Sequence, residues 1–348
     1  MEHNRNQSNQ YKQKRPLIIL TGPTAVGKSA LSIQLARAIH GQMISADSMQ
    51  VYRKMDIGTA KITPEEMQGI PHYLINVLEP EEEFNVVRFQ KMAKEALEKI
   101  YHAGAIPIVV GGTGFYIQAL LYDIAFEQTG PPAVDTSPGG EGDGETDAET
   151  DAETVYRQNL QQLAREQGAN YLHGKLRQVD PVSADAIHPN NVKRVIRALE
   201  YYHQTGTRIS AHNEEQRKKE SPYQFLYFVL TDDRQTLYER IDRRIDTMIE
   251  RGLVDEVRRL QMAGCTSSMV SMQGLGYKEI LNYLEGNCSL EEAVYILKRD
   301  TRHFAKRQLT WFRRERDVIW LDRRCFQSQD ALLKEMLKRI QEMNLAIL

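Results

Sequence analysis

Apolar and polar positions in the first part of the chain alternate between short hydrophobic runs and longer amphipathic stretches. Such runs are typical of buried strands, and they cover residues 17–20, 42–48, 72–78 and 106–110. Helical spacing of apolar residues predicts a helix that begins near residue 28. It predicts a second helix over 86–102 with Asn85 as its N-cap. Strands that alternate with helices favour an α/β fold, with a parallel sheet flanked by helices.

The pattern changes after residue 126. Residues 127–154 are rich in Gly, Pro, Thr and acidic side chains, which predicts a disordered linker with too little apolar surface to fold. A helical pattern follows, so the sequence predicts an inserted all-helical domain over 127–189. The remaining domain boundaries that we expect are a flexible tail over 1–15, a core formed by 16–126 and 190–322, and a C-terminal helix over 323–348.

One uncharged stretch has nearly the length of a membrane span. It runs from Ala103 to Tyr122, but Pro107 and three glycines interrupt it. We therefore expect a buried strand, a turn and a helix there, and no membrane segment.

Composition limits the class of protein further. The chain has 348 residues and a formal net charge of −2, which excludes a uniformly basic binder but not a local basic surface. Its three cysteines lack the spacing of a zinc ribbon or a disulfide scaffold. The polar N-terminus has no apolar signal region. Together these features favour a cytoplasmic protein, with a monomer as the simplest expectation.

The strongest local motif is GPTAVGKS, which follows the first predicted strand and opens the first helix. It matches the phosphate-binding loop GxxxxGK[ST] and predicts a P-loop NTPase-like core. Backbone N–H groups of such a loop bind phosphate, the Lys28 ammonium adds charge, and the Ser29 hydroxyl is a candidate Mg²⁺ ligand. The candidate diphosphate-binding residues are Gly22, Pro23, Thr24, Ala25, Val26, Gly27, Lys28 and Ser29.

The usual second acid of a nucleotide hydrolase is missing from the predicted strand at 106–110. An acid, Asp47, instead ends the run at 42–48. Because the carboxyl ends of parallel strands share one edge, Asp47, the phosphate loop and Thr113 are expected around one cleft. Asp47 is either a general base or a cap of the next turn. These residues alone indicate a small-substrate kinase or another transferase that uses a phosphorylated donor.

Three basic patches occur in the second half of the chain. Lys298 to Arg316 carries eight basic and two acidic residues with interleaved aromatic side chains. The other two patches consist of Lys193, Arg194 and Arg197, and of Arg240, Arg243 and Arg244. Each patch alone fits a solvated helix face, whereas three in a chain of balanced charge favour nucleic acid.

The motifs together resemble the tRNA dimethylallyltransferase family, also called tRNA isopentenyltransferases, over residues 16–322. The resemblance rests on GPTAVGKS, ADSMQVYRKMDIGTAK, PHYLINV, GGTGFYIQALL, HPNNVKRVIRALE, MIERGLVDEV, GLGYKEI and AKRQLTWFRR in this order. It implies transfer of a dimethylallyl group from dimethylallyl diphosphate to N6 of the adenosine 3′ of the tRNA anticodon. It also implies Mg²⁺ as cofactor, the anticodon stem-loop as partner, and no obligate protein partner.

The resemblance also assigns roles to individual residues. The catalytic residues that it implies are Asp47 as general base, with Lys28, Thr24 and Arg244 at the diphosphate; the adjacent Arg243 is the alternative to Arg244. Ser29 is the implied metal ligand. The implied tRNA-binding residues are Asp47, Ser48, Met49, Gln50, Thr113, Arg157, Lys193, Arg194, Arg197, Gln273, Lys278, Lys306, Arg307, Gln308 and Arg313.

Three alternatives remain open at the level of sequence. A small-molecule kinase would use the same loop and Asp47, but it has no need for the basic patches. An isopentenyltransferase acting on free adenine nucleotides would share the core. An RNA-binding protein without activity would leave the intact phosphate loop and Asp47 without a role.

Overall fold

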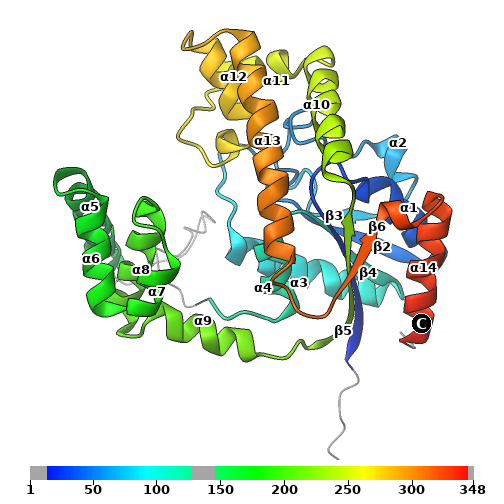
Figure 1. The fold of residues 1–348 in the computed structure, drawn as a ribbon, viewed down its shortest axis with the longest axis horizontal. Helices are drawn as coiled ribbons and strands as arrows, with labels where there is room; N and C mark the ends of the chain where they lie inside the picture. Colours follow the sequence, from blue (N-terminus) through cyan, green and yellow to red (C-terminus); the bar gives the residue numbers. More distant parts are fainter. Residues whose placement is uncertain (1–13, 127–145, 344–348) are drawn as a thin grey trace, which may run out of the picture. The chain divides into compact units, whose positions relative to one another are not determined.

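A sheet of six parallel strands positions the phosphate loop at the carboxyl ends of its strands. The computed structural model describes residues 14–126 and 146–343. The strand order is β3-β2-β4-β1-β5-β6, and every paired neighbour is parallel (Figure 1). The strands are β1 (Arg15–Thr21), β2 (Gly41–Ala46), β3 (His72–Tyr73), β4 (Ile106–Gly111), β5 (Tyr223–Thr231) and β6 (Val318–Asp322). The predicted α/β fold with a P-loop NTPase-like core is therefore confirmed.

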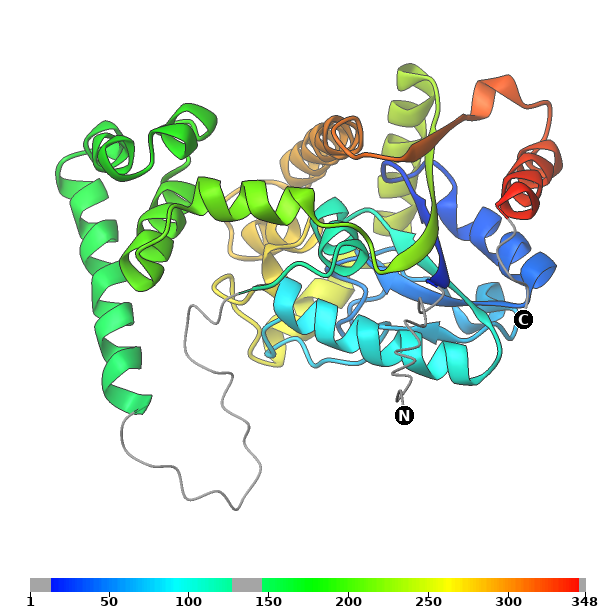
Figure 2. The same ribbon diagram turned by 90° about the horizontal axis from the view of Figure 1, so that it is seen from below.

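Helices connect these strands, and some of them pack against the sheet. They are α1 (Lys28–Ile39), α2 (Pro64–Met67), α3 (Val86–His102), α4 (Gly114–Leu121), α10 (Arg234–Glu250), α11 (Leu253–Met262), α12 (Tyr277–Leu284), α13 (Leu290–Phe312) and α14 (Gln329–Glu342). Helix α1 lies beside α14, and α3 lies beside α4 (Figures 1 and 2). The predicted bounds of α3 are confirmed, and Asn85 Oδ1 accepts the predicted capping hydrogen bond from Arg88 N.

The apolar runs predicted as strands form the core of this unit. Leu17, Ile18, Ile19 and Leu20 of β1 are completely buried, because β1 has a strand on each side and helices over its faces. The uncharged stretch 103–122 forms β4, a turn and α4, as expected. Among the described residues, no helix is long and apolar enough to cross a membrane.

The expected strand over 72–78 is much shorter than its apolar run. It pairs only at His72 and Tyr73. Leu74 and Asn76 have positive φ angles of 63° and 55°, which interrupt an extended backbone. The C-terminal region also differs, since a 3₁₀ turn, η2 (Arg323–Cys325), precedes α14. Arg15, which was assigned to the tail, opens β1, while residues 1–13 and 344–348 lie outside the described chain.

Residues Ile124–Glu220 form a second unit with its own apolar centre. Its helices are α5 (Thr146–Glu166), α6 (Ala169–Val179), α7 (Pro181–Ala186), α8 (Val192–Thr205) and α9 (Ile209–Lys218). Leu172, Leu176, Val195 and Leu199 are buried together in its centre.

The unit extends further along the chain than expected. We expected the core to resume at residue 190, but α8 and α9 belong to the helical unit because the apolar face of α8 packs against α5 and α6. Helix α5 begins at Thr146, inside the stretch expected to be a disordered linker. Residues 127–145 of that linker lie outside the described residues.

The last residue of β4, Gly111, provides a test of packing at the carboxyl ends of the strands. A Cβ atom on Gly111 would overlap the backbone of Ala46 in the adjacent strand, which cannot move without breaking the sheet. We expect Gly111→Ala to lower the free energy of unfolding by about 2–4 kcal/mol. Thermal unfolding of the full chain measures this effect.

The matched control is Gly174→Ala in α6, where an added Cβ meets no atom within 4 Å. It should leave the melting temperature unchanged or raise it, because Ala is the better helix former by about 0.5–1 kcal/mol. Equal melting temperatures for Gly111→Ala and the unchanged protein would contradict the packing argument.

Candidate active site

The phosphate loop connects β1 to α1 through glycines with positive φ angles. Gly22 has a φ of 144°, and a Cβ atom there would lie 2.5 Å from Leu230 O. Gly27 caps α1 with a φ of 94° and makes no side-chain capping bond. The first N–H groups of a helix lack intrahelical acceptors and carry partial positive charge. The loop predicted from the sequence therefore has the geometry of an anion site.

The Lys28 ammonium is held inside this loop. Its Nζ donates hydrogen bonds to Gly22 O at 2.9 Å and to Pro23 O at 2.8 Å. Burial and the charge of Arg244 lower the pKa of Lys28 to about 7, and the charge of Asp47 acts in the opposite direction. Burial also lowers the pKa of Arg244, again opposed by Asp47. These three residues are thus electrostatic neighbours, whereas Arg243 is exposed, so the arrangement favours Arg244 over Arg243.

Asp47 follows β2 and has two distinct carboxylate oxygens. Its Oδ1 accepts hydrogen bonds from Met49 N at 2.9 Å and from Gln50 N at 3.3 Å. The carboxylate therefore does cap the turn after β2. Among the described residues, no hydrogen bond reaches Oδ2, so the second oxygen is available for a substrate proton. Thr113 is tied to the same edge, since its N donates to Ala46 O at 3.2 Å.

Gln308 has a role that sequence reasoning missed. Its side chain is only 6% exposed; Oε1 accepts from Thr24 N and Nε2 donates to Gly112 O, each at 2.9 Å. Both ends of the amide thus make a hydrogen bond within the protein, and the expected RNA contact at Gln308 stays a prediction. The residue joins α13 to the phosphate loop and to the turn before α4. Gly112 leaves room for this amide, because a Cβ there would overlap Nε2.

An arginine-rich cleft of about 290 Å³ lies beside Arg244. Its other lining residues are Ile57, Ala60, Arg240, Arg243, Thr247, Met248 and Arg251. The loop at Ile57 is fixed by buried Glu256, whose carboxylate accepts hydrogen bonds from the N–H groups of Asp56, Ile57 and Gly58 and from the Tyr277 hydroxyl. Sequence reasoning missed Glu256; its only signal is an acid on the apolar face of α11.

Several predicted RNA-binding residues have partners inside the protein. Arg157 of α5 donates to the buried carboxylate of Glu200 on α8, with Nη2 3.1 Å from Oε2, and its expected RNA contact stays a prediction. Gln50 contacts Ser45 and Thr59. Met49 packs against Gly274.

The basic patch on α13 is divided in the same way. Lys298 and Arg302 pair with Asp246 and Asp242 of α10, at 2.6 and 2.8 Å. Other predicted RNA-binding residues of the core are exposed. They are Gln273, Lys278, Lys306, Arg307 and Arg313. On α8 of the helical unit, Lys193, Arg194 and Arg197 are exposed.

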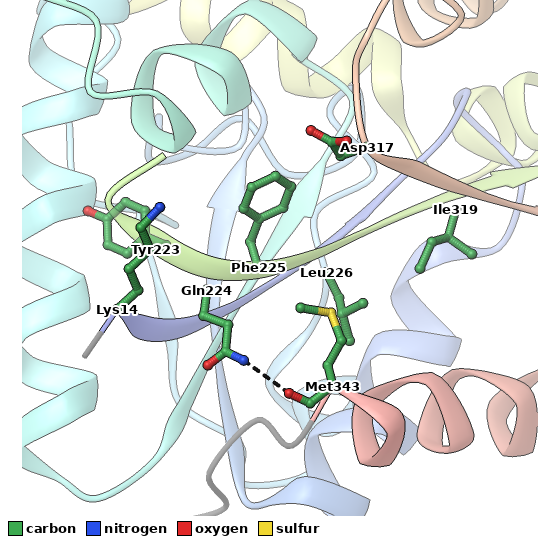
Figure 3. A pocket seen from close by; sticks show the side chains of 8 residues that line it. All are labelled: Lys14, Tyr223, Gln224, Phe225, Leu226, Asp317, Ile319 and Met343. Carbon is green, nitrogen blue, oxygen red and sulfur yellow. Dashed lines mark hydrogen bonds between the residues drawn. The ribbon is translucent and has the colours of Figure 1, made fainter. Parts of the chain in front are cut away.

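Another opening, shown in Figure 3, lies at the opposite, amino-terminal ends of the strands. It is lined at the start of β5 by Tyr223, Gln224 and Phe225, and it reaches Lys14 and Met343. Gln224 Nε2 donates to Met343 O at 3.0 Å. Because it lies at the start of β5, this opening is not part of the site at the carboxyl ends of the strands.

The fold and the site define a P-loop transferase rather than a hydrolase, and the comparisons with known proteins agree. A family model described as IPP transferase matches residues 50–315. A tRNA dimethylallyltransferase of Lachnoclostridium phytofermentans is 60% identical over 94% of this chain and 98% of its own. The chain belongs to the IPP transferase family.

Solved structures show the same similarity. A tRNA isopentenylpyrophosphate transferase of Bacillus halodurans superposes with a TM-score of 0.65, at 41% identity and with 95% of this chain and 97% of that chain covered. A eukaryotic dimethylallyltransferase acting on tRNA gives a TM-score of 0.73 at 31% identity, covering 94% of this chain and 79% of that one.

The lowered pKa of Lys28 predicts a pH dependence of anion binding. A bound diphosphate favours the charged ammonium, so above pH 7 binding must take up a proton. We expect the affinity for inorganic pyrophosphate to fall by up to about tenfold per pH unit above pH 7. Calorimetry from pH 6.5 to 9 measures it. The Lys28→Met variant binds more weakly and should lack this dependence; the same slope in both proteins would exclude Lys28 as its source.

Proposed function

We propose that this protein transfers a dimethylallyl group from dimethylallyl diphosphate to N6 of the adenosine 3′ of the anticodon in tRNA. The observation that carries the proposal is the convergence of Lys28, Arg244 and Asp47 at the carboxyl edge of the sheet. Two cations can stabilise the charge of a leaving diphosphate, and one carboxylate can accept a proton from a substrate amine. Membership of the IPP transferase family supports the choice of isoprenoid and RNA as substrates.

The proposed reaction is a displacement at the allylic carbon. The bond from C1 to the diphosphate oxygen breaks as the N6–C1 bond forms, and the electron pair of the broken bond leaves with diphosphate. Loop N–H groups, together with Lys28 and Arg244, stabilise the charge that develops there. N6 loses a proton to Asp47 Oδ2, while Oδ1 keeps the carboxylate oriented through the two amides.

Mg²⁺ is the cofactor that the site would accommodate. Ser29 is exposed at the start of α1, next to the diphosphate loop. No cluster of three or more His, Cys, Asp or Glu residues able to hold a metal occurs in residues 14–126 and 146–343. The hydroxyl of Ser29 as a single protein donor fits Mg²⁺, which is commonly bound through few protein ligands and substrate phosphates. When bound, the ion would neutralise charge on the diphosphate.

The anticodon stem-loop is the proposed RNA partner. Exposed cations on α13 and α12 provide a surface for its phosphates, and those on α8 provide another within the helical unit. The target base must leave its stack to reach Asp47, and we expect Thr113, which follows the adjacent strand, to contact it. A cytoplasmic location follows from such a substrate, as part of the same proposal.

A transfer assay tests the function directly. The protein and Mg²⁺ are incubated with labelled dimethylallyl diphosphate and, separately, with unmodified tRNA, AMP or ATP. We expect label in tRNA alone, and digestion of the product should yield N6-dimethylallyladenosine. Label in AMP or ATP would instead indicate a free-nucleotide isopentenyltransferase, and absence of transfer to any acceptor would overturn the proposal.

Two variants of Asp47 separate its capping and proton-accepting roles. Asp47→Asn keeps an oxygen that can cap the turn but removes the base, so we expect the chemical rate to fall by about 10²-fold or more with tRNA affinity nearly unchanged. Asp47→Ala should also lower thermal stability, by about 1 kcal/mol, through loss of the cap. Single-turnover transfer measures the chemical rate, tRNA binding measures the affinity, and thermal unfolding measures the loss of the cap. Full turnover by Asp47→Asn would remove Asp47 from the mechanism.

A further inference from the structure

Arg323 contacts the phosphate loop from the far end of the chain. It follows β6 in the turn η2, and β6 pairs with β5, so its end lies at the same edge of the sheet as the loop. Arg323 Nη1 donates to Val26 O at 3.4 Å. A Cβ atom on Gly27 would lie 3.0 Å from the same Nη1. The guanidinium therefore lies directly beside the residue that caps α1.

A buried carboxylate holds this guanidinium in place. Arg323 Nε lies 3.7 Å from Asp232 Oδ2, and Arg240 Nη1 donates to the same oxygen at 2.7 Å. The Asp232 side chain is only 7% exposed. Arg240 also lines the cleft beside Arg244. Asp232 thus connects the arginine on the loop to the arginine-rich cleft.

The charges around the start of α1 favour an anion there. A cation at a helix N-terminus is repelled by the partial positive charge of the free N–H groups. Here Arg323 lies at Gly27, and Lys28 and Arg244 are neighbours in the same site. Asp232 and Asp47 compensate this positive charge only in part. A diphosphate would supply the missing negative charge on the same side as the loop N–H groups.

We propose that Arg323 is a further diphosphate-binding residue, which acts on the leaving group together with Lys28 and Arg244. The proposal deepens the proposed function and rests on it. Arg323 lies beyond residues 50–315, which the IPP transferase family model matches. Its neighbour Arg324 is exposed and pairs with Asp322, with Nη2 2.6 Å from Oδ2, so adjacent arginines have different surroundings.

The test uses inorganic pyrophosphate with Mg²⁺ as the probe and calorimetry as the measurement. Arg323→Gln keeps a donor for Val26 O but removes the charge, and we expect its dissociation constant to rise about tenfold. Arg323→Lys keeps the charge and should bind within about threefold of the unchanged protein. Arg324→Gln is the matched control, with an expected change below about twofold.

Two results would overturn the proposal. Pyrophosphate binding by Arg323→Gln at unchanged affinity would show that Arg323 only supports the loop through Val26 O. Equal weakening in Arg323→Gln and Arg324→Gln would show a general effect of net charge. Melting temperatures confirm that all variants are folded. Because pyrophosphate binding needs no RNA, failure of this proposal is distinguishable from failure of the transfer reaction to tRNA.

Discussion

Concentrated positive charge at the N-terminus of α1 is the constraint on which the rest of the site depends. An anion bound there would meet the positive end of the helix dipole and the Lys28 ammonium. This ammonium donates to Gly22 O and Pro23 O, which are carbonyl oxygens of the loop itself. The burial that this position imposes lowers the pKa of Lys28 to about 7. A bound anion would therefore favour the charged form of Lys28.

Helix α13 connects this charged loop to the surface proposed to bind RNA. Its buried Gln308 touches Thr24 N and Gly112 O, while exposed Lys306 and Arg307 precede it in the same helix. Any displacement of α13 would strain two hydrogen bonds at the edge where Asp47 and Thr113 lie. Trp311 packs against Gly114 in the same turn, which adds a steric link. The position of α13 and the geometry of the phosphate loop are thus coupled through these contacts.

Local signals account for what the sequence predicted well. The phosphate loop, the 86–102 helix and its Asn85 cap depend on residues close together in the chain, and the adjacency of Asp47 and Thr113 follows from parallel strand pairing. Side-chain partners far apart in sequence have no such signal. Nothing local indicates that Gln308 meets Thr24, or that Arg157 neutralises Glu200. The spacing of apolar residues likewise predicted a helix in the region of α8, but it did not indicate which unit buries the apolar face of that helix.

Strand topology explains why the site draws on both ends of the chain. Strand β1 pairs with β4 on one side and with β5 on the other, and β5 pairs with β6. All run parallel, so the residues that follow each strand meet at one edge: the loop after β1, Thr113 after β4, Asp232 after β5 and Arg323 after β6. Because β2 is the other neighbour of β4, Asp47 joins them from that side. The carboxylate of Asp47 and the cations Lys28, Arg244 and Arg323 therefore follow strands from opposite halves of one sheet. In the proposed reaction this places the base on one side of the reacting carbon and the leaving diphosphate on the other.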